Sequence, residues 1–179
     1  MKILVISDTH GDTGKAKKIW ASHDGLDLVI HLGDYYRDAE ELASSVKTEV
    51  IAVPGNMDRE CDAPGRKVLQ TEYGPVLITH GHREKVKRSY DNLLYSTEEA
   101  GCKAVLFGHT HAAIHEEIDG IHIINPGSLS YPRDGNPGSY ALITTTPDSF
   151  DCRIIYLKDK KLKSSGGLLR SLLNYSDRL

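Results

Sequence analysis

The first third of the chain alternates short apolar runs with helix-like segments, and this alternation constrains the fold more than any other feature. The runs at 2–7, 26–34 and 48–56 are rich in Ile, Leu and Val. Such runs are typical of strands that are buried on both faces of a sheet. Segments 13–24 and 37–45 lie between them and have the composition of helices. Because the links are short, parallel βαβ units are expected, and the fold class is α/β.

The remainder of the chain predicts a second sheet. Two further buried strands are expected at 74–82 and 102–111, with a long helix over 83–101 between them. The later pattern alternates apolar and polar residues, which is typical of antiparallel pairs. Those pairs are expected over 112–127 and over 139–146 with 150–157. The architecture predicted from the residues is a two-sheet α/β sandwich with a mixed or parallel first sheet and a more antiparallel second one.

The length of 179 residues suits one domain, which we place at residues 1–157. Residues 158–167 form a basic linker rich in Ser and Gly, and 168–179 could form a short helix with leucines on one side. We expect that leucine-bearing segment to pack on its own domain or to fray, rather than to bind a partner.

Composition limits the compartment and the partners. The three cysteines form no CxxC pair, so neither a disulfide framework nor a thiolate metal site is indicated, and a cytoplasmic location is expected. No run approaches the roughly 20 apolar residues of a membrane span. The net charge of -3 provides no broad positive field for a nucleic-acid polymer. Neither a membrane nor a nucleic acid is therefore an expected partner.

Side chains that can bind metals follow five successive predicted strands, each beside a glycine. They are Asp8 and His10 after the first strand, Asp34 after the second, Asn56 after the third, His80 after the fourth, and His109 and His111 after the fifth, with His82 two residues past His80. One such residue in a turn is common, but five independent turns seldom all choose Asp, His or Asn. Since the carboxyl ends of parallel strands meet at one sheet edge, these side chains are expected to share one pocket.

The donor set of this pocket favours two metal ions. Two aspartates, one asparagine and four histidines without thiolate suit Mn, Fe, Zn, Ni or Co better than a structural Cys-type zinc site. Seven ligands are too many for one ion with an open position, and they fit two ions about 3.5–4 Å apart that share a carboxylate. That arrangement indicates hydrolysis at phosphorus.

The motifs "DTH", "HLGD", "PGNMD", "THGH" and "GHTH", in this order, resemble the calcineurin-like metallophosphoesterase superfamily. The resemblance covers residues 1 to about 157 and is greatest to the small bacterial and archaeal phosphodiesterase branch. It implies an αββα sandwich with mixed sheets and the site at the sheet edge. It also implies a dinuclear-metal-dependent phosphodiesterase, in which a metal-bridging hydroxide attacks a small phosphodiester in line.

The resemblance further implies a role for each ligand. The first ion would be held by Asp8, His10 and His111, and the second by Asn56, His80 and His109. Asp34 would bridge the two ions, and Asn56 would also position a phosphoryl oxygen. Manganese is the expected metal, with Ni, Fe, Zn or Co as alternatives. The loop that contains Ser128 and Arg133 would lie near the pocket, where either residue could contact substrate or order the site.

Met57 stands where many members of the superfamily carry the histidine of "GNHE", which acts as a general acid or stabilises the leaving oxygen. A thioether cannot donate a proton. His82 and Asp58 are candidate substitutes, and the third alternative is that no dedicated acid exists. We therefore expect aryl diesters to be hydrolysed better than alkyl ones, and an apolar Met57 to widen the pocket wall for an organic group.

Several alternatives remain at this stage. One is a phosphomonoesterase of the same superfamily, and another is a non-catalytic scaffold similar to the retromer subunit of eukaryotes. Nuclease action on DNA lacks support in the charge balance. A homodimer or homotetramer is compatible with the sequence. Among the other histidines, His31 is expected in the core or behind the ligands, whereas His23, His115 and His122 are expected to have no role at the site.

Overall fold

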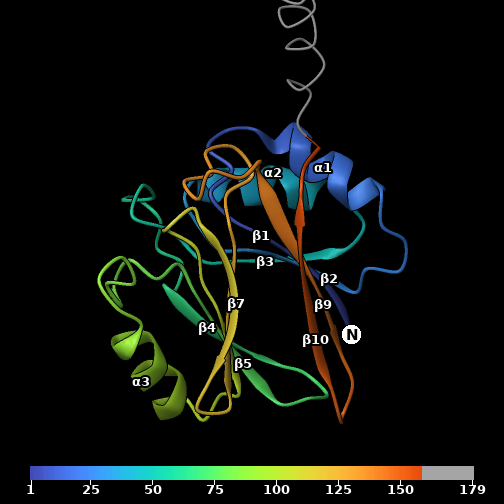
Figure 1. Cartoon of the computed structure of the whole chain (residues 1–179). Helices are drawn as coiled ribbons and strands as arrows, with labels where there is room; N and C mark the ends of the chain where they lie inside the picture. Colours follow the sequence, from blue (N-terminus) through green and yellow to red (C-terminus); the bar gives the residue numbers. More distant parts are fainter. Residues whose placement is uncertain (159–179) are drawn as a thin grey trace, which may run out of the picture.

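The computed structural model describes residues 1–158, which form two five-stranded sheets. The first sheet has the order β10-β9-β1-β2-β3, and the second has the order β4-β5-β6-β8-β7 (Figure 1). The strands of the first sheet are β1 (Lys2–Ile6), β2 (Leu28–His31), β3 (Glu49–Ala52), β9 (Ser139–Thr145) and β10 (Phe150–Tyr156). Those of the second are β4 (Arg66–Gln70), β5 (Pro75–Thr79), β6 (Ala104–Leu106), β7 (Ala113–Ile118) and β8 (Ile121–Pro126).

Both sheets are mixed, as expected, but the second is not more antiparallel than the first, because β9 and β10 join the first sheet. In the first, β1, β2 and β3 are parallel and β9 runs antiparallel to β1. In the second, β5, β6 and β8 are parallel, while β4 and β7 pair antiparallel at the edges. Both predicted antiparallel pairs are present, β7 with β8 and β9 with β10. The Asp119-Gly120 turn of the first pair has positive φ at both residues, which is typical of a two-residue hairpin loop.

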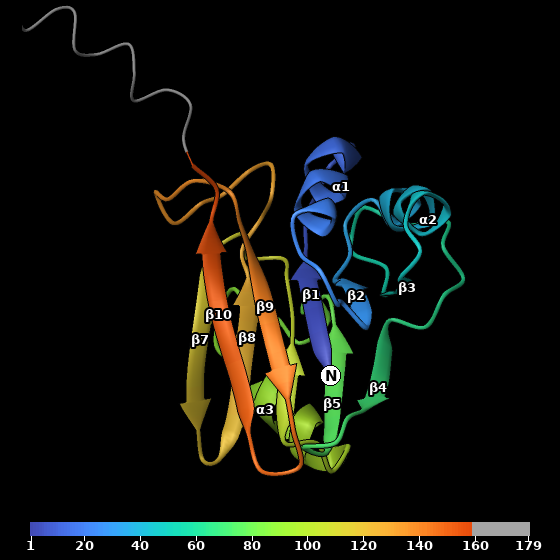
Figure 2. The same cartoon turned by 90° about the vertical axis from the view of Figure 1, so that its right-hand side faces the viewer.

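Three helices complete the layers. Helices α1 (Thr13–Ala21) and α2 (Tyr36–Ser45) pack on the outer face of the first sheet, and α3 (Asp91–Glu99) packs on the outer face of the second (Figures 1 and 2). Alternate residues of β1 serve the two faces, because Ile3 and Val5 lie between the sheets while Leu4 and Ile6 face the helices. This explains the continuous apolar runs of the sequence and confirms the αββα sandwich.

Two elements differ from the sequence-based expectation. The helix predicted at 83–101 begins only at Asp91, because Glu84 is buried, with its carboxylate accepting hydrogen bonds from Arg66 and Thr79. Lys85 adopts a left-handed conformation (φ 57°), so the chain turns there instead of winding into a helix. Strand β4 was not predicted. The segment expected at 168–179 lies outside the described residues.

Among residues 1–158, no helix is long and apolar enough to cross a membrane. The cysteines at 61, 102 and 152 are free thiols, in agreement with the expected absence of a disulfide framework.

Candidate metal centre

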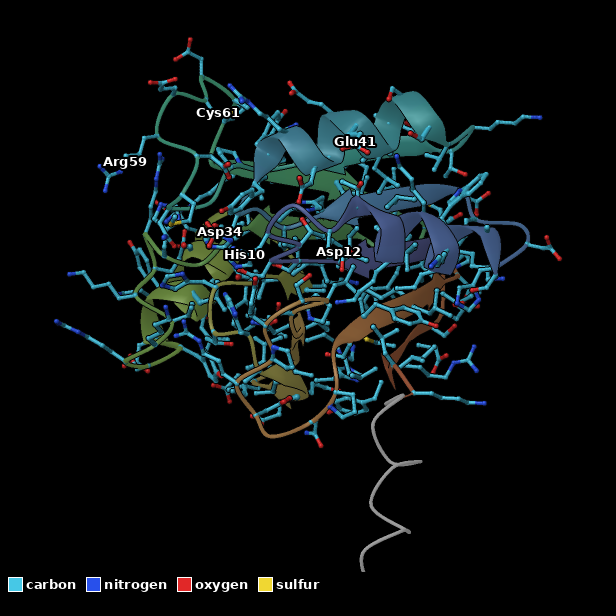
Figure 3. The ribbon with its side chains drawn as sticks, turned by 90° about the horizontal axis from the view of Figure 1, so that it is seen from above. His10, Asp12, Asp34, Glu41, Arg59 and Cys61 are labelled. Atoms are coloured by element: carbon cyan, nitrogen blue, oxygen red, sulfur yellow. The ribbon has the colours of Figure 1, made fainter. Side chains whose placement is uncertain are left out.

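Four of the predicted ligands converge between the sheets at the ends of their strands. Asp8 and His10 follow β1, Asp34 follows β2 and His111 follows β6. One ligand atom from each lies within 4.8 Å of all the others. Figure 3 shows His10 and Asp34 side by side at the centre of the molecule. Asp8, Asp34 and His111 are buried and His10 is partly exposed, so an ion held here would be reached from one side only.

A second group adjoins Asp34. The Nε2 atom of His80 lies 3.4 Å from Asp34 Oδ1, and the ring centroids of His80 and His109 are 5.1 Å apart. His82 is next to both rings, at 5.3 Å from His80 and 6.1 Å from His109. Asp34 therefore lies between two ligand groups, which is the place that a bridging carboxylate requires.

Asn56 is the predicted ligand that the structure leaves at the rim. Its side chain is exposed and makes no hydrogen bond within residues 1–158. Its neighbour is closer to the carboxylate, because the backbone N–H of Met57 donates to Asp34 Oδ1 at 3.1 Å. The turn therefore contacts the centre through its backbone, with the amide of Asn56 beside it.

Backbone carbonyl groups orient the rings of two buried histidines, His80 and His111. His80 Nδ1 lies 2.6 Å from the carbonyl oxygen of Leu32, and His111 Nδ1 lies 2.7 Å from that of Tyr131. Because a carbonyl can only accept, each Nδ1 carries a proton, and each Nε2 is the ring atom that faces the aspartates. Metal-binding histidines are commonly oriented in this way.

Several buried polar atoms at the centre lack a partner within the described part of the chain. These atoms are Asp8 Oδ1, His10 Nε2 and His80 Nε2. By contrast, Asp8 Oδ2 accepts hydrogen bonds from the Ser7 hydroxyl and the His109 backbone N–H. Unpaired buried acceptors are costly, and divalent cations would satisfy these atoms, one at Asp8 and His10 and a second at His80. The residues present therefore fit a metal site.

The backbone at the centre adopts a rarely populated conformation. Five residues have φ between 49° and 67°, namely Asp8, His10, Asp34, His109 and His111. Each non-glycine residue in this region costs on the order of 1 kcal/mol or more. Such strain persists where the surrounding structure enforces it, and it is common at functional sites.

Glycines allow the loops to approach closely. A Cβ atom on Gly55 would overlap the Asp34 carboxylate, and one on Gly108 would overlap the Ser7 hydroxyl. Gly55 does not have a positive φ, so its absent side chain, not its backbone freedom, matters at this turn. The turn could be recognised from the sequence, but its contact with Asp34 could not.

Burial and neighbouring charges shift the pKa values of the side chains at the centre. Burial would raise the pKa of Asp8, but contact with His111 and the charges of His80 and His111 outweigh it and lower the pKa. The same contact with Asp8 raises the pKa of His111, against the effect of burial. Burial, with the charges of His80 and Lys87, lowers the pKa of His109 to about 4, so this imidazole is neutral and free to bind metal at neutral pH.

A buried hydrogen-bond chain supports the ligand loop after β1. His31 Nδ1 accepts from the Gly33 N–H at 3.2 Å, so its Nε2–H donates to the Thr9 hydroxyl at 2.9 Å. Thr9 in turn donates to Asp38 at 2.5 Å, and Asp38 also accepts from the Gly11 N–H. Thr9 lies between two predicted ligands, so this chain holds the loop from behind. His31 was expected there, whereas Thr9 and Asp38 were missed.

The other predicted residues occupy distinct places. Both oxygens of Asp58 accept backbone hydrogen bonds, from Tyr36 at 2.7 Å and from Gly55 at 2.8 Å. Ser128 donates to the backbone oxygen of Asp8 at 2.8 Å and so orders the ligand loop. Arg133 lines a cavity of about 520 Å³ that opens beside His10.

The histidines expected to have no role lie elsewhere. His23 contacts the Tyr140 hydroxyl at 3.0 Å, and His122 stacks on Phe150, next to the exposed His115.

We predict that Gly55→Ala will weaken metal binding and lower the free energy of unfolding by about 1–3 kcal/mol, because the new methyl group displaces the Asp34 carboxylate. Calorimetric Mn²⁺ titration and chemical denaturation measure both effects. The matched control is Gly14→Ala in α1, where a Cβ makes only ordinary contact and stability should be unchanged or slightly raised. Wild-type metal affinity in Gly55→Ala would contradict the close-approach argument.

A second prediction concerns pH. Burial lowers the pKa of His31 from 6.5 to about 4, so between these values the unfolded chain binds a proton that the folded chain does not. His31 therefore lowers the free energy of unfolding as the pH falls through this range, by about 3 kcal/mol in total.

In His31→Gln, measured without metal, the change in stability between about pH 7 and about pH 5 should be smaller than in the wild type. His115→Gln, at an exposed position on β7, is the control. An unaltered pH dependence in His31→Gln would show that His31 does not titrate as expected.

Comparison with known proteins identifies the family. Residues 1–148 match the calcineurin-like phosphoesterase superfamily domain. "Probable metallophosphoesterase YsnB" of Bacillus subtilis is 34% identical over 154 residues, which cover 86% of this chain and 89% of that protein. Phosphodiesterase YfcE of Escherichia coli K12 is 29% identical over 191 residues, which cover 90% and 95% of the two chains.

Solved structures agree with this assignment. A predicted phosphoesterase of Streptococcus pneumoniae TIGR4 superposes with a TM-score of 0.76 at 28% identity, covering 87% of this chain and 88% of that one. Vps29 of Entamoeba histolytica, complexed with Zn²⁺, has a TM-score of 0.70 at 18% identity, over 87% and 98% of the chains, and shares the fold. From the family match, the relatives and the site geometry together, the chain belongs to the calcineurin-like phosphoesterase superfamily.

Proposed function

We propose that this protein is a dinuclear-metal-dependent phosphodiesterase that acts on a small phosphodiester. The observation that carries the proposal is the position of Asp34, which lies within 4.8 Å of ligand atoms of the first group and 3.4 Å from His80 of the second. The name of the Escherichia coli relative, a phosphodiesterase, supports the reaction class.

Each ion would have its own ligands. Asp8, His10 and His111 would hold the first ion, and His80, His109 and the rim residue Asn56 the second, with Asp34 shared. Manganese is our expected metal, since nitrogen and oxygen donors without thiolate suit it. Two such ions would supply Lewis acidity toward the phosphoryl oxygens and a water of lowered pKa.

The chain itself provides orientation and charge. The carbonyl groups of Leu32 and Tyr131 fix the rings of His80 and His111, so their Nε2 atoms stay directed at the centre. Two carboxylates, Asp8 and Asp34, offset the charge of the ions, and the exposed amide of Asn56 is available to donate to a phosphoryl oxygen.

Proton donation to the leaving group is the weak part of this site. Met57 cannot donate, and both oxygens of Asp58 already accept backbone N–H groups. His82 remains the candidate acid because it lies beside His80 and His109. Burial, followed by the charges of His80 and Arg83, lowers its pKa, so little of the protonated form exists at neutral pH. Esters whose alcohol leaves as a stable anion should therefore react best.

We expect bis(p-nitrophenyl) phosphate to be hydrolysed faster than p-nitrophenyl phosphate, and diesters with leaving groups of graded pKa to show a steep dependence of kcat on that pKa. EDTA should abolish turnover and Mn²⁺ should restore it. His115→Gln, away from the centre, should retain the activity. A flat leaving-group dependence would indicate a working acid, and a preference for the monoester would favour the phosphomonoesterase alternative.

Introducing a proton donor at the turn should help only poor leaving groups. Met57→His is expected to raise kcat for an alkyl leaving group by about tenfold or more, within the range typical of acid catalysis, and to change kcat for p-nitrophenol little. The backbone N–H that binds Asp34 is retained. Met57→Leu, which keeps an apolar side chain, is the control. No gain with alkyl esters in Met57→His would count against the missing-acid argument.

The second candidate is a non-catalytic scaffold, which the shared fold with Vps29 makes worth testing. A scaffold could bind Mn²⁺ without hydrolysing any diester. A Mn²⁺ titration run together with the ester assay distinguishes the two, because binding without turnover across the whole substrate panel would favour the scaffold.

A further inference from the structure

A second cavity of about 630 Å³ opens beside the metal centre. It lies between the start of α2 and the loop at 56–61, and Figure 3 shows Arg59 and Cys61 on that loop, at the outer margin of the molecule on the same side as Asp34. Its size is within the range of small-molecule sites in proteins. None of the seven predicted metal ligands lines it, but Tyr35 and Met57, the chain neighbours of Asp34 and Asn56, form its inner wall.

The wall of this cavity exposes apolar side chains that a folded protein normally covers. Met57 is 57% exposed and Tyr35 is 41% exposed. The Tyr35 ring also packs edge-on against His10, with centroids 5.1 Å apart, so one residue contacts both the cavity and the centre. Exposed apolar groups beside a polar site commonly mark the place where a ligand binds.

The cavity is held in shape without a ligand. The Asp58 carboxylate bonds the backbone N–H of Tyr36 on one wall and that of Gly55 at the base of the other. Tyr35 has φ of 71° and ψ of 66°, a conformation that is strained for a tyrosine and directs its ring to this place. A site that is already formed loses little conformational entropy when it binds.

The charges of the lining indicate the kind of group that fits. Two arginines and two glutamates, Arg37, Arg59, Glu40 and Glu60, belong to the lining, and none of the four has an ion-pair partner within 4 Å in the described part of the chain. A second phosphate would require an excess of positive charge, which this lining does not provide, because Asp58 adds a third carboxylate to those of Glu40 and Glu60. An uncharged ring that offers both donors and acceptors matches it better, stacked on Tyr35 and against Met57.

We propose that this cavity binds a nucleobase as one organic arm of the phosphodiester, so that the substrate is a nucleotide diester of low molecular weight. This inference rests on the proposed phosphodiesterase function. Met57 and Arg59 line this cavity and not the one beside His10, whereas Tyr131 lines only the cavity beside His10. Variants of these residues can therefore distinguish binding in this cavity from binding in the cavity beside His10.

The test compares two substrates that release the same alcohol, thymidine 5′-(p-nitrophenyl phosphate) and methyl p-nitrophenyl phosphate, with Mn²⁺. The thymidine ester should have a kcat/KM about tenfold higher, mainly through a lower KM, because base stacking adds binding energy. Met57→Ala and Arg59→Ala should each reduce this ratio to about threefold or less, and Tyr131→Ala should preserve it. The control for general effects is Tyr95→Ala on α3, because the Tyr95 side chain is about as exposed as that of Tyr131.

Equal kcat/KM values for the two esters in the wild type would overturn the proposal, as would loss of the ratio in Tyr131→Ala alone. A binding measurement keeps the test independent of turnover. Saturation-transfer NMR of thymidine 5′-(methyl phosphate) in EDTA should show transfer to the base protons, and Met57→Ala should reduce it. Transfer without any hydrolysis by the Mn²⁺-loaded protein would support the cavity and reject the phosphodiesterase, and absent transfer would reject the cavity.

Discussion

The Asp34 carboxylate against the backbone of the Gly55–Met57 turn is the contact on which the rest of the site depends. It joins the end of β2 to the end of β3, and through His80 it reaches the second sheet. The contact of His111 with Asp8 connects the sheets in the same way. The apolar core between the sheets holds these loops together, and a cation would add to this by satisfying the buried polar atoms that lack a partner.

The fold could be predicted from the sequence because its central strands are buried on both faces. Strands β1, β2 and β5 read as apolar runs, and their polar ends therefore identified the site. Edge strand β4 was missed because only one of its faces is partly buried. The early part of the predicted helix was wrong because Glu84 is buried with Arg66, a pairing between residues 18 positions apart that periodicity does not reveal.

The candidate ligands could be recognised from the sequence, but the residues that hold them in place by hydrogen bonds could not. Residue type and strand position indicated Asp8, Asp34 and the histidines. The Thr9–Asp38 hydrogen bond joins the loop after β1 to helix α2, 29 residues further along the chain, and only coordinates show it. Proximity in sequence suggested a chemical role for Asp58, yet its oxygens are occupied by backbone N–H groups. The backbone and the side chain of Met57 have different roles. Its N–H donates to Asp34 at the metal centre, while its side chain lines the adjacent cavity.

The left-handed backbone of five candidate ligands would link the lifetime of the folded protein to its metal supply if the centre binds its ions. An ion that binds only the folded chain offsets the cost of these conformations, and the benefit grows with the free-ion concentration. Molecules made when the metal is scarce would open more readily at this edge and be degraded sooner. Cellular abundance of the protein would then follow the metal pool even when transcription is constant.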